Sequence, residues 1–397
     1  ASNIIPGIDA VVYTAAIHED NEEFKAAADA GLPMLSRAEL LGQLMKNYET
    51  PIAVSGTHGK TTTTSMLSHI LLAGDLDPTI SVGGILKAIG GNIRVGDSGL
   101  FVTEACEYTN SFLHFFPKIG IILNIDADHL DFFKDLDDIR CSFRKFAELL
   151  PEDGALIINA DIPDLDAFTE GLKCKVIRYG NDSSLDYSAT NILHDNVGDA
   201  SFDLVKSGIF MDRISLSVNG DHNVSNALAA IAACDILGVP VETIKQGLQA
   251  FTGTKRRFEY KGEIHCTSAI YDYAHHPTEI RAALEAARHY PHQEIWCVFQ
   301  PHTYTRTKAL FADFVSALST TDHVILADIY AARETDTLGI SSGDIASALK
   351  EQGCGAYYFS SFEEIESFCL RQCKKGDLLI TMGAGDVVNI GEALLNH

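Results

Sequence analysis

A glycine-rich turn near residue 55 contains the residue types that a phosphate-binding loop needs. Glycines let backbone N–H groups face phosphate oxygens, and the N-terminus of a following helix favours negative charge. Lys60 can reach the β- and γ-phosphates of a nucleotide, and the Thr61 hydroxyl can bind Mg²⁺. The usual motif has a further glycine where this chain has Val54, and the alternative is a plain turn with a surface lysine. The segment that predicts a nucleoside triphosphate site is Ser55-Gly56-Thr57-His58-Gly59-Lys60-Thr61-Thr62.

Acidic residues follow two of the apolar runs that we expect to be strands. The carboxyl ends of neighbouring parallel strands meet at one edge of a sheet, where ligands bind. Mg²⁺ prefers hard oxygen ligands and keeps several waters, so one or two carboxylates suffice. Any one of these residues could be a solvated loop side chain, but two clusters beside a phosphate loop predict a magnesium site. The clusters are Glu104 with Glu107, and Asp126 with Asp128 and His129.

The elements that must position these residues follow from the apolar pattern. Strands alternate with helices from Pro51 onwards, which favours an α/β fold with a mostly parallel sheet. In a first unit we expect strands at 51–54, 99–103, 118–125 and 155–158, helices at 61–73 and 223–237, and an antiparallel segment within 187–220. In a second unit from about residue 254 we expect strands at 268–271, 294–299, 323–329 and 377–381, with helices beginning at Pro277, near Thr307, at Ser342 and near Asp386.

The composition excludes several classes of protein. A chain of 397 residues is too long for one core, so two or three domains are expected. Its net charge of −24 disfavours a nucleic-acid partner. No apolar run is long enough to cross a bilayer and no export signal is visible, so we expect no membrane partner. The nine cysteines contain no CxxC pair, which indicates reduced thiols in a cytoplasm.

Further motifs extend along the chain, and with the phosphate loop they make it resemble the Mur ligase family from Asp9 to the C-terminus. These motifs are Glu-Ala-Cys-Glu-Tyr-Thr-Asn-Ser-Phe-Leu from Glu104, Asn-Ile-Asp-Ala-Asp-His from Asn124, Asp-His-Asn-Val-Ser-Asn-Ala from Asp221, Arg-Arg-Phe from Arg256, Asp-Tyr-Ala-His-His-Pro-Thr-Glu from Asp272, and Phe-Gln-Pro-His-Thr-Tyr-Thr-Arg-Thr from Phe299. Each motif alone is weak, and their order makes the resemblance specific.

The resemblance implies a three-domain α/β architecture. A Rossmann-like N-terminal domain would bind a UDP-sugar, a P-loop ATPase-like central domain would bind ATP, and a Rossmann-like C-terminal domain would bind an amino acid and close over the site. We assign residues 1–48, 49–252 and 253–397 to these domains. The first is expected to be a truncated remnant, because it resembles only the later part of its domain and lacks the glycine-rich UDP loop.

The resemblance also implies ATP and Mg²⁺ as cofactors, with UDP-N-acetylmuramate and L-alanine as substrates. Lys60 and the loop amides would bind the ATP phosphates, and Arg257 would contact the γ-phosphate. Thr61 and Glu104 would bind one Mg²⁺, and His129 a second. Residues at the nucleoside would be His222, Asn223 and Asn226 at adenine and Asp272 at the ribose. Residues at the other substrates would be Thr14 near the uridine nucleotide, and His275, His302 and Arg306 around muramate and alanine. Taken alone, the adenine set could be a helix cap with surface amides, Arg257 a solvated side chain, and His275 part of ordinary helix-start packing.

The implied reaction is attack of the muramate lactyl carboxylate on ATP, followed by attack of the alanine amine on the acyl phosphate, in peptidoglycan precursor synthesis. Alternatives are a muramyl-tripeptide ligase, a folate-type glutamate ligase, or a nucleotide-responsive regulatory protein with a degenerate site. One departure concerns carboxylate recognition: many members have Arg where this chain has Thr303, and Arg306 or Arg281 are the candidates to compensate. We expect a cytoplasmic monomer or weak homo-oligomer.

Overall fold

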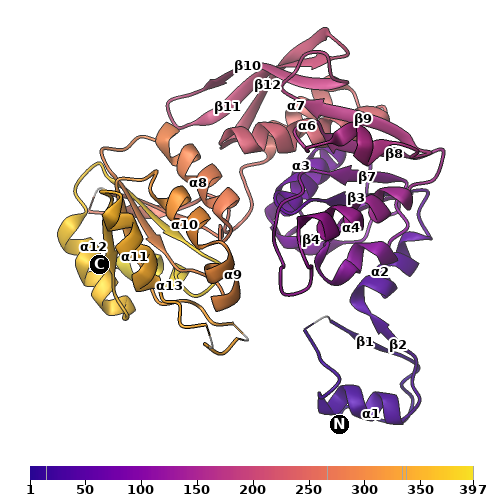
Figure 1. The fold of residues 1–397 in the computed structure, drawn as a ribbon. Coiled ribbons are helices and arrows are strands. Elements are labelled where there is room, and N and C mark those ends of the chain that lie inside the picture. The colour runs from indigo at the N-terminus through magenta and orange to yellow at the C-terminus, as the bar shows by residue number, and fades with distance from the viewer. Residues whose placement is uncertain (15, 266, 333, 337, 397) are drawn as a thin grey trace.

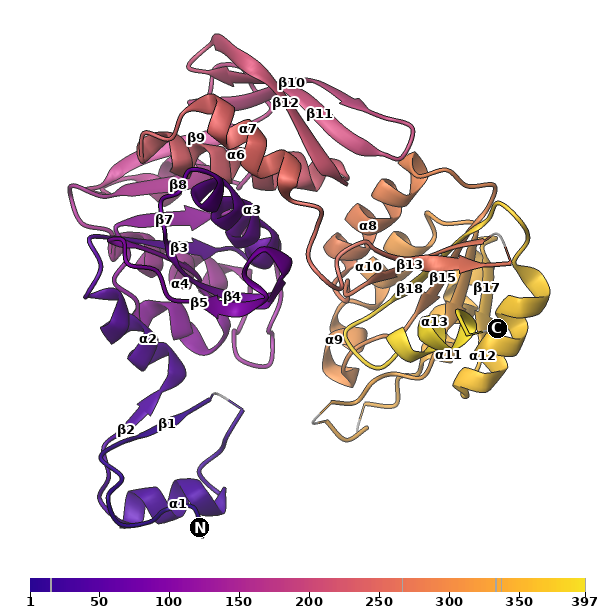
Figure 2. The same ribbon diagram turned by 180° about the vertical axis from the view of Figure 1, so that it is seen from behind.

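A computed structural model describes residues 1–397 except 15, 266, 333, 337 and 397. The chain forms a small N-terminal segment, a central unit and a C-terminal unit, in that order (Figure 1). The N-terminal segment and the C-terminal unit contact different sides of the central unit in both views (Figures 1 and 2). Among the described residues, no helix has the length and apolar character needed to cross a bilayer.

The N-terminal segment is a small βαβα arrangement. Its elements are β1 (Val11–Tyr13), α1 (Glu22–Asp29), β2 (Met34–Ser36) and α2 (Arg37–Met45), and the two strands pair in parallel. A capping box starts α2: the Ser36 hydroxyl accepts a hydrogen bond from the Glu39 N–H, and the Glu39 carboxylate accepts one from the Ser36 N–H at 2.7 Å. Helix α2 packs tightly on the central unit, because a Cβ on Gly42 would lie 2.0 Å from the carbonyl oxygen of His114.

The described residues of the central unit form a ten-stranded sheet in the order β12-β11-β10-β9-β8-β7-β3-β6-β4-β5. Its strands are β3 (Thr50–Ser55), β4 (Thr79–Leu86), β5 (Gly91–Arg94), β6 (Leu100–Glu104), β7 (Ile119–Ile122), β8 (Ala155–Asn159), β9 (Lys175–Gly180), β10 (Tyr187–His194), β11 (Asp199–Lys206) and β12 (Ile209–Asn219). Strands β4 and β6 to β10 pair in parallel around β3, whereas β5, β11 and β12 are antiparallel to their neighbours. The predicted antiparallel segment is therefore the edge of the same sheet.

Helices cover both faces of this sheet. They are α3 (Lys60–Ala73), η1 (Lys87–Ile89), η2 (Tyr108–His114), α4 (Leu136–Glu148), α5 (Leu165–Thr169), α6 (Asp221–Ile236) and α7 (Val241–Ala250). Along β3 the side chains alternate: Ile52 and Val54 join the core with α3, α6 and α7, and Ala53 joins the core with α2, η2 and α4. Gly247 of α7 lets the helices approach closely, because a Cβ there would lie 2.4 Å from the Cα of Ile70 in α3.

The described residues of the C-terminal unit form a six-stranded sheet in the order β13-β14-β18-β15-β16-β17, parallel except for β13. Its elements are β13 (Glu259–Ile264), β14 (Thr267–Asp272), α8 (Pro277–His289), β15 (Ile295–Phe299), α9 (Tyr304–Ala309), α10 (Phe311–Leu318), β16 (His323–Leu326), α11 (Ser342–Glu351), β17 (Gly355–Tyr358), α12 (Phe362–Gln372), β18 (Leu378–Met382) and α13 (Val388–Leu394). Apolar residues of α8, α10 and α11 form the core on one face, and those of α12 and α13 form it on the other.

The predicted α/β class and mostly parallel sheets are confirmed. The strand expected over residues 118–125 is shorter in the structure, because the chain leaves the sheet after Ile122 to form the loop that carries Asp126 and Asp128. Eight of the nine cysteines are free thiols in the described part of the chain, and Cys266 lies outside it.

Candidate active site

The glycine-rich turn connects β3 to the first residue of α3, where a phosphate loop must lie. Gly59 is the N-cap of α3 with φ 85°, and Gly56 has φ 141°, a backbone region that favours glycine. A Cβ on Gly56 would lie 2.9 Å from the Cβ of Leu123 on the adjacent strand loop. Asn124 fixes the turn by accepting a hydrogen bond from the His58 N–H at 2.8 Å and donating one to the His58 carbonyl at 3.1 Å.

The Lys60 ammonium lies inside this turn. It donates hydrogen bonds to the carbonyl oxygens of Gly56 at 2.5 Å and Thr57 at 3.0 Å, and to the carboxylate of Glu107 at 2.9 Å. Burial alone would lower the pKa of Lys60, but the neighbouring Glu107 carboxylate offsets that effect and the pKa is raised. The group is therefore a fixed positive charge held at the mouth of the loop, not a free surface lysine.

The two residues predicted to share one metal ion are adjacent. The Thr61 hydroxyl donates a hydrogen bond to Glu104 at 3.0 Å, and the other Glu104 oxygen accepts one from the Gly83 N–H at 2.5 Å. The β3–β6 register places Val54 beside Glu104, which brings the strand end next to the loop. His129, the candidate for a second ion, has its Nε2 atom 3.8 Å from a Glu107 oxygen.

A cleft of about 370 Å³ lies between the central and C-terminal units, beside the loop. Its walls include every residue predicted to contact the nucleoside: His222, Asn223, Asn226 and Asp272, with Arg257 beside them. Asn223 and Asn226 are buried and hydrogen-bonded to each other, and the N-cap of α6 is Gly220. The alternative reading of these asparagines as surface amides or helix caps is therefore wrong.

The C-terminal unit supplies charged groups to the cleft. Arg257 pairs with Glu279 at 3.2 Å. Burial alone would raise the pKa of Glu279, but His275 and Arg257 outweigh burial and hold that pKa well below its usual value. Asp272 is 6% exposed, and its carboxylate accepts hydrogen bonds from two backbone N–H groups, one of them that of Phe258 at 2.7 Å. Burial raises the pKa of Asp272 to about 6.

The residues predicted to line the muramate and alanine site are also together. Arg306 donates to His302 Nδ1 at 3.1 Å, and the His302 and His275 rings lie 5.8 Å apart. Arg306 also pairs with Asp128 of the central unit at 2.9 Å. Burial, with the positive charges of His275 and Arg306, lowers the pKa of His302 to about 4.

Two further predicted positions lie apart from this group. Thr14 follows β1 in the N-terminal segment, is exposed, and accepts a hydrogen bond from the Ala16 N–H at 3.1 Å. Arg281, one candidate to compensate for Thr303, has its guanidinium 3.9 Å from Asp313 of α10. The other candidate, Arg306, lies one helical turn after Thr303.

The contacts of three charged residues in the site were not predicted. Glu279 contacts both Arg257 and His58. It ends the motif that begins at Asp272, but the sequence analysis gave it no role. Glu107 was recognised as part of an acidic cluster, but its pairing with Lys60 had no sequence signal. Burial alone would lower the pKa of His58, but the carboxylates of Asp126 and Glu279 raise it to about 9.

Known families and proteins match almost the whole chain. Family models match as "Mur ligase family, catalytic domain" over residues 1–49, "Mur ligase middle domain" over 54–234 and "Mur ligase, glutamate ligase domain" over 256–385. The UDP-N-acetylmuramate–L-alanine ligase of Lachnospira eligens is 59% identical, and the alignment covers all of this chain and 86% of that protein. The corresponding ligase of Agathobacter rectalis is 60% identical with the same coverage.

The fold also matches solved structures of ligases over nearly the whole chain. The crystal structure of UDP-N-acetylmuramate–alanine ligase from Thermotoga maritima superposes with a TM-score of 0.83 at 28% identity, covering 100% of this chain and 86% of that one. A murein peptide ligase from Psychrobacter arcticus superposes with a TM-score of 0.69 at 26% identity, covering 98% and 86%. The predicted three-domain architecture is confirmed, and the chain belongs to the Mur ligase family.

Proposed function

We propose that this protein is an ATP-dependent ligase that joins L-alanine to the lactyl carboxylate of UDP-N-acetylmuramate. The activity named for the relatives that align with the whole chain supports this substrate pair. The observation that carries the proposal is one cleft lined both by Gly59, the phosphate-loop residue directly before Lys60, and by Arg257 of the C-terminal unit. Two cations from separate domains suit a reaction that transfers a phosphoryl group and requires closure.

The nucleotide is proposed to occupy the cleft between the two units. A cavity of about 370 Å³ is within the range of sites that bind small molecules. Asn223 and Asn226 supply amide groups for the adenine edge, and Asp272, which also lines the cleft, is the candidate partner of the ribose. The phosphates then extend toward the loop N–H groups and the N-terminus of α3, which favour negative charge.

The pair Thr61 and Glu104 fits a magnesium ion. Their oxygens lie 3.0 Å apart, which matches the edge of about 3 Å expected between neighbouring ligands of an octahedral ion with bonds of about 2.1 Å. Both donors are hard oxygens, as Mg²⁺ requires. We propose that they hold one ion, with His129 near a second. Bound magnesium would supply positive charge that offsets the charge on the phosphate oxygens.

The chain's own residues then explain the chemistry. A lactyl carboxylate oxygen attacks the γ-phosphorus of ATP, the bond to the β-phosphate oxygen breaks, and ADP leaves. Lys60 and Arg257 stabilise the charge on the transferring group, which is what this chemistry chiefly needs from a protein. The alanine amine next attacks the carbonyl of the acyl phosphate, and loss of phosphate and a proton gives the amide. His275, His302 and Arg306 are placed to orient the acceptor and the amino acid.

Phosphate release with UDP-N-acetylmuramate, ATP and a panel of amino acids tests the proposal. We expect release that depends on both acceptor and L-alanine, and a loss of about 10²–10³-fold in kcat for Lys60→Ala. Lys173→Ala, at an exposed lysine, serves as the matched control and retains activity. Near-wild-type turnover by Lys60→Ala would refute the role of the loop.

The same panel separates the alternatives. Release with a muramyl tripeptide or with glutamate in place of alanine would indicate another member of the family. ATP binding without acceptor-dependent hydrolysis would indicate a regulatory protein. We also propose a cytoplasmic location, in keeping with the free thiols, and a monomer or weak homo-oligomer, which sedimentation of the purified chain measures.

A further inference from the structure

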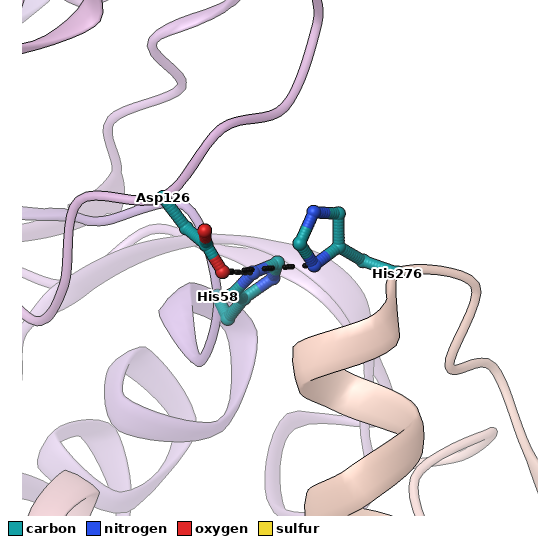
Figure 3. A group of neighbouring side chains, drawn as sticks. All are labelled: His58, Asp126 and His276. Carbon is teal, nitrogen blue, oxygen red and sulfur yellow. Dashed lines mark hydrogen bonds and ion pairs between the residues drawn. The ribbon is translucent and has the colours of Figure 1, made fainter. Parts of the chain in front are cut away.

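Three potential metal ligands from both units meet beside the phosphate loop. His58 lies in the loop before α3, Asp126 follows β7, and His276 is the N-cap residue of α8 in the C-terminal unit (Figure 3). His58 Nε2 is 3.2 Å and His276 Nδ1 is 3.6 Å from the same oxygen, Oδ2, of Asp126. The three ligand atoms all lie within 4.8 Å of one another.

These separations suit a tetrahedral ion. Zinc binds histidine nitrogen and carboxylate oxygen at about 2.0–2.2 Å, so neighbouring ligand atoms around it are about 3.3–3.5 Å apart. The two separations that meet at Asp126, 3.2 and 3.6 Å, each lie within about 0.1 Å of this range. The separation between the two histidine nitrogens is at most 4.8 Å, so a small approach of the rings completes the geometry. Two imidazoles and one carboxylate leave a fourth position for water, and they favour zinc or a similar transition metal over magnesium.

The outer contacts of both imidazoles resemble those of metal-bound histidines. His276 Nε2 is 3.1 Å from the carbonyl oxygen of Ala127, a contact that fixes the N–H on Nε2 and leaves the Nδ1 lone pair free of a proton. His58 Nδ1 is 3.4 Å from a Glu279 oxygen, so a carboxylate supports the imidazole whose Nε2 faces Asp126. Such carboxylate–histidine pairs orient the ring and increase its basicity toward a metal. A metal ion must displace the proton that His58 Nε2 donates to Asp126 in the metal-free chain.

Existing hydrogen bonds compete with an ion at this position. The Thr278 N–H donates to His276 Nδ1 at 3.3 Å, and the Thr278 hydroxyl donates to Asp126 Oδ2 at 2.5 Å. The first bond is long, and the second uses one lone pair of an oxygen that has others. Asp126 has 33% of its side chain exposed, so an ion and a water can reach the cluster from solvent, whereas His276 is 4% exposed.

We propose that His58, Asp126 and His276 form an inter-domain site for a transition-metal ion such as Zn²⁺, distinct from the oxygen-rich magnesium position at Thr61 and Glu104. Because the ligands come from two units, the ion links the C-terminal unit to the phosphate loop and holds the two units in contact. If the proposed ligase function is correct, product release requires that these units separate. Zinc bound here therefore slows turnover, and this second statement alone rests on the proposed function.

Direct metal binding tests the site without substrates. The metal-free full chain is titrated with Zn²⁺ by calorimetry, and with Co²⁺ to observe the visible absorption of a tetrahedral ion. We expect one ion per chain, at least tenfold weaker binding in Asp126→Asn and His276→Asn, and no change in His18→Ala, at an exposed histidine. Asparagine is a good N-cap residue, so His276→Asn keeps the start of α8 while removing the imidazole.

The outcomes separate the two statements. Absent binding, or binding that neither variant weakens, overturns the site, because a zinc ion held elsewhere does not need these residues. Both statements are supported if the variants lose zinc binding and if zinc slows phosphate release in the wild type but not in His276→Asn. Zinc binding at these residues without slower turnover retains the site and overturns the statement that bound zinc slows turnover. A chain that lacks ligase activity altogether leaves the binding result intact and refutes the proposed function instead.

Discussion

Replacing Lys60 should destabilise the central unit even without nucleotide, and the contacts of its ammonium give the magnitude. Lys60 has 16% and Glu107 only 2% of the side chain exposed, and they pair at 2.9 Å. Lys60→Met keeps most of the aliphatic volume but leaves the Glu107 carboxylate buried without its main partner. Breaking a buried pair in this way costs about 3–5 kcal/mol. His129, whose Nε2 atom is 3.8 Å from Glu107, offers partial compensation, so we expect the lower end.

The double variant Lys60→Met/Glu107→Gln isolates the charge effect. Neutral glutamine removes the stranded charge, so the double variant should be more stable than Lys60→Met by at least about 1.5 kcal/mol. Hydrogen exchange of peptides from β3 and α3, followed over a series of urea concentrations, measures the unfolding free energy of the central unit by itself. This separation is needed because a multi-domain chain does not unfold in one step. A cost below about 1 kcal/mol for Lys60→Met, or simple additivity in the double variant, would refute the reasoning.

Three other perturbations test packing, charge and closure. Gly247→Ala forces α7 away from the α3 backbone and should cost about 1–3 kcal/mol in central-unit unfolding, whereas Gly343→Ala, whose added Cβ meets no atom closer than 3.4 Å, should not destabilise. Because the pKa of His302 falls from 6.5 to about 4 on folding, the native state binds fewer protons, so its stabilising effect is complete above pH 6.5 and is lost as pH falls through about 4. We therefore expect the unfolding free energy of the C-terminal unit, measured by urea at several pH values from 7 to 4, to fall less steeply with decreasing pH in His302→Asn than in the wild type. Arg306→Met leaves Asp128 buried and unpaired between the units and should shift the chain toward an open arrangement, seen as a larger radius in X-ray scattering, with Arg306→Met/Asp128→Asn closer to wild type.

Features that depend on local sequence were predictable. The loop around Lys60 combines glycine, lysine and threonine between an apolar strand and a helix, and each of those signals lies within a few residues. The helix of residues 61–73 was evident because Met66, Leu67, Ile70 and Leu71 recur at helical spacing, and all four are fully buried.

Elements with weak apolar patterns were not predicted. The strand β5 is polar and largely exposed. Strand β17 has four residues, too few for an alternating pattern to be distinguished from a loop. These elements owe their conformation to pairing or packing against neighbours, which one sequence does not display.

The partners of charged side chains were the least predictable part of the site, and the start of α8 shows why. Three side chains there point to different partners. His275 faces His302, and His276 contacts Asp126. Glu279 lies between Arg257 and His58. Pro277 and the apolar residues that follow predict that a helix begins here, but not which unit each preceding side chain will face. That depends on the docking of the C-terminal unit against the loop after β7. The candidate catalytic residues are thus encoded locally, whereas the contacts that join the two units link residues more than a hundred positions apart, such as His276 with Ala127.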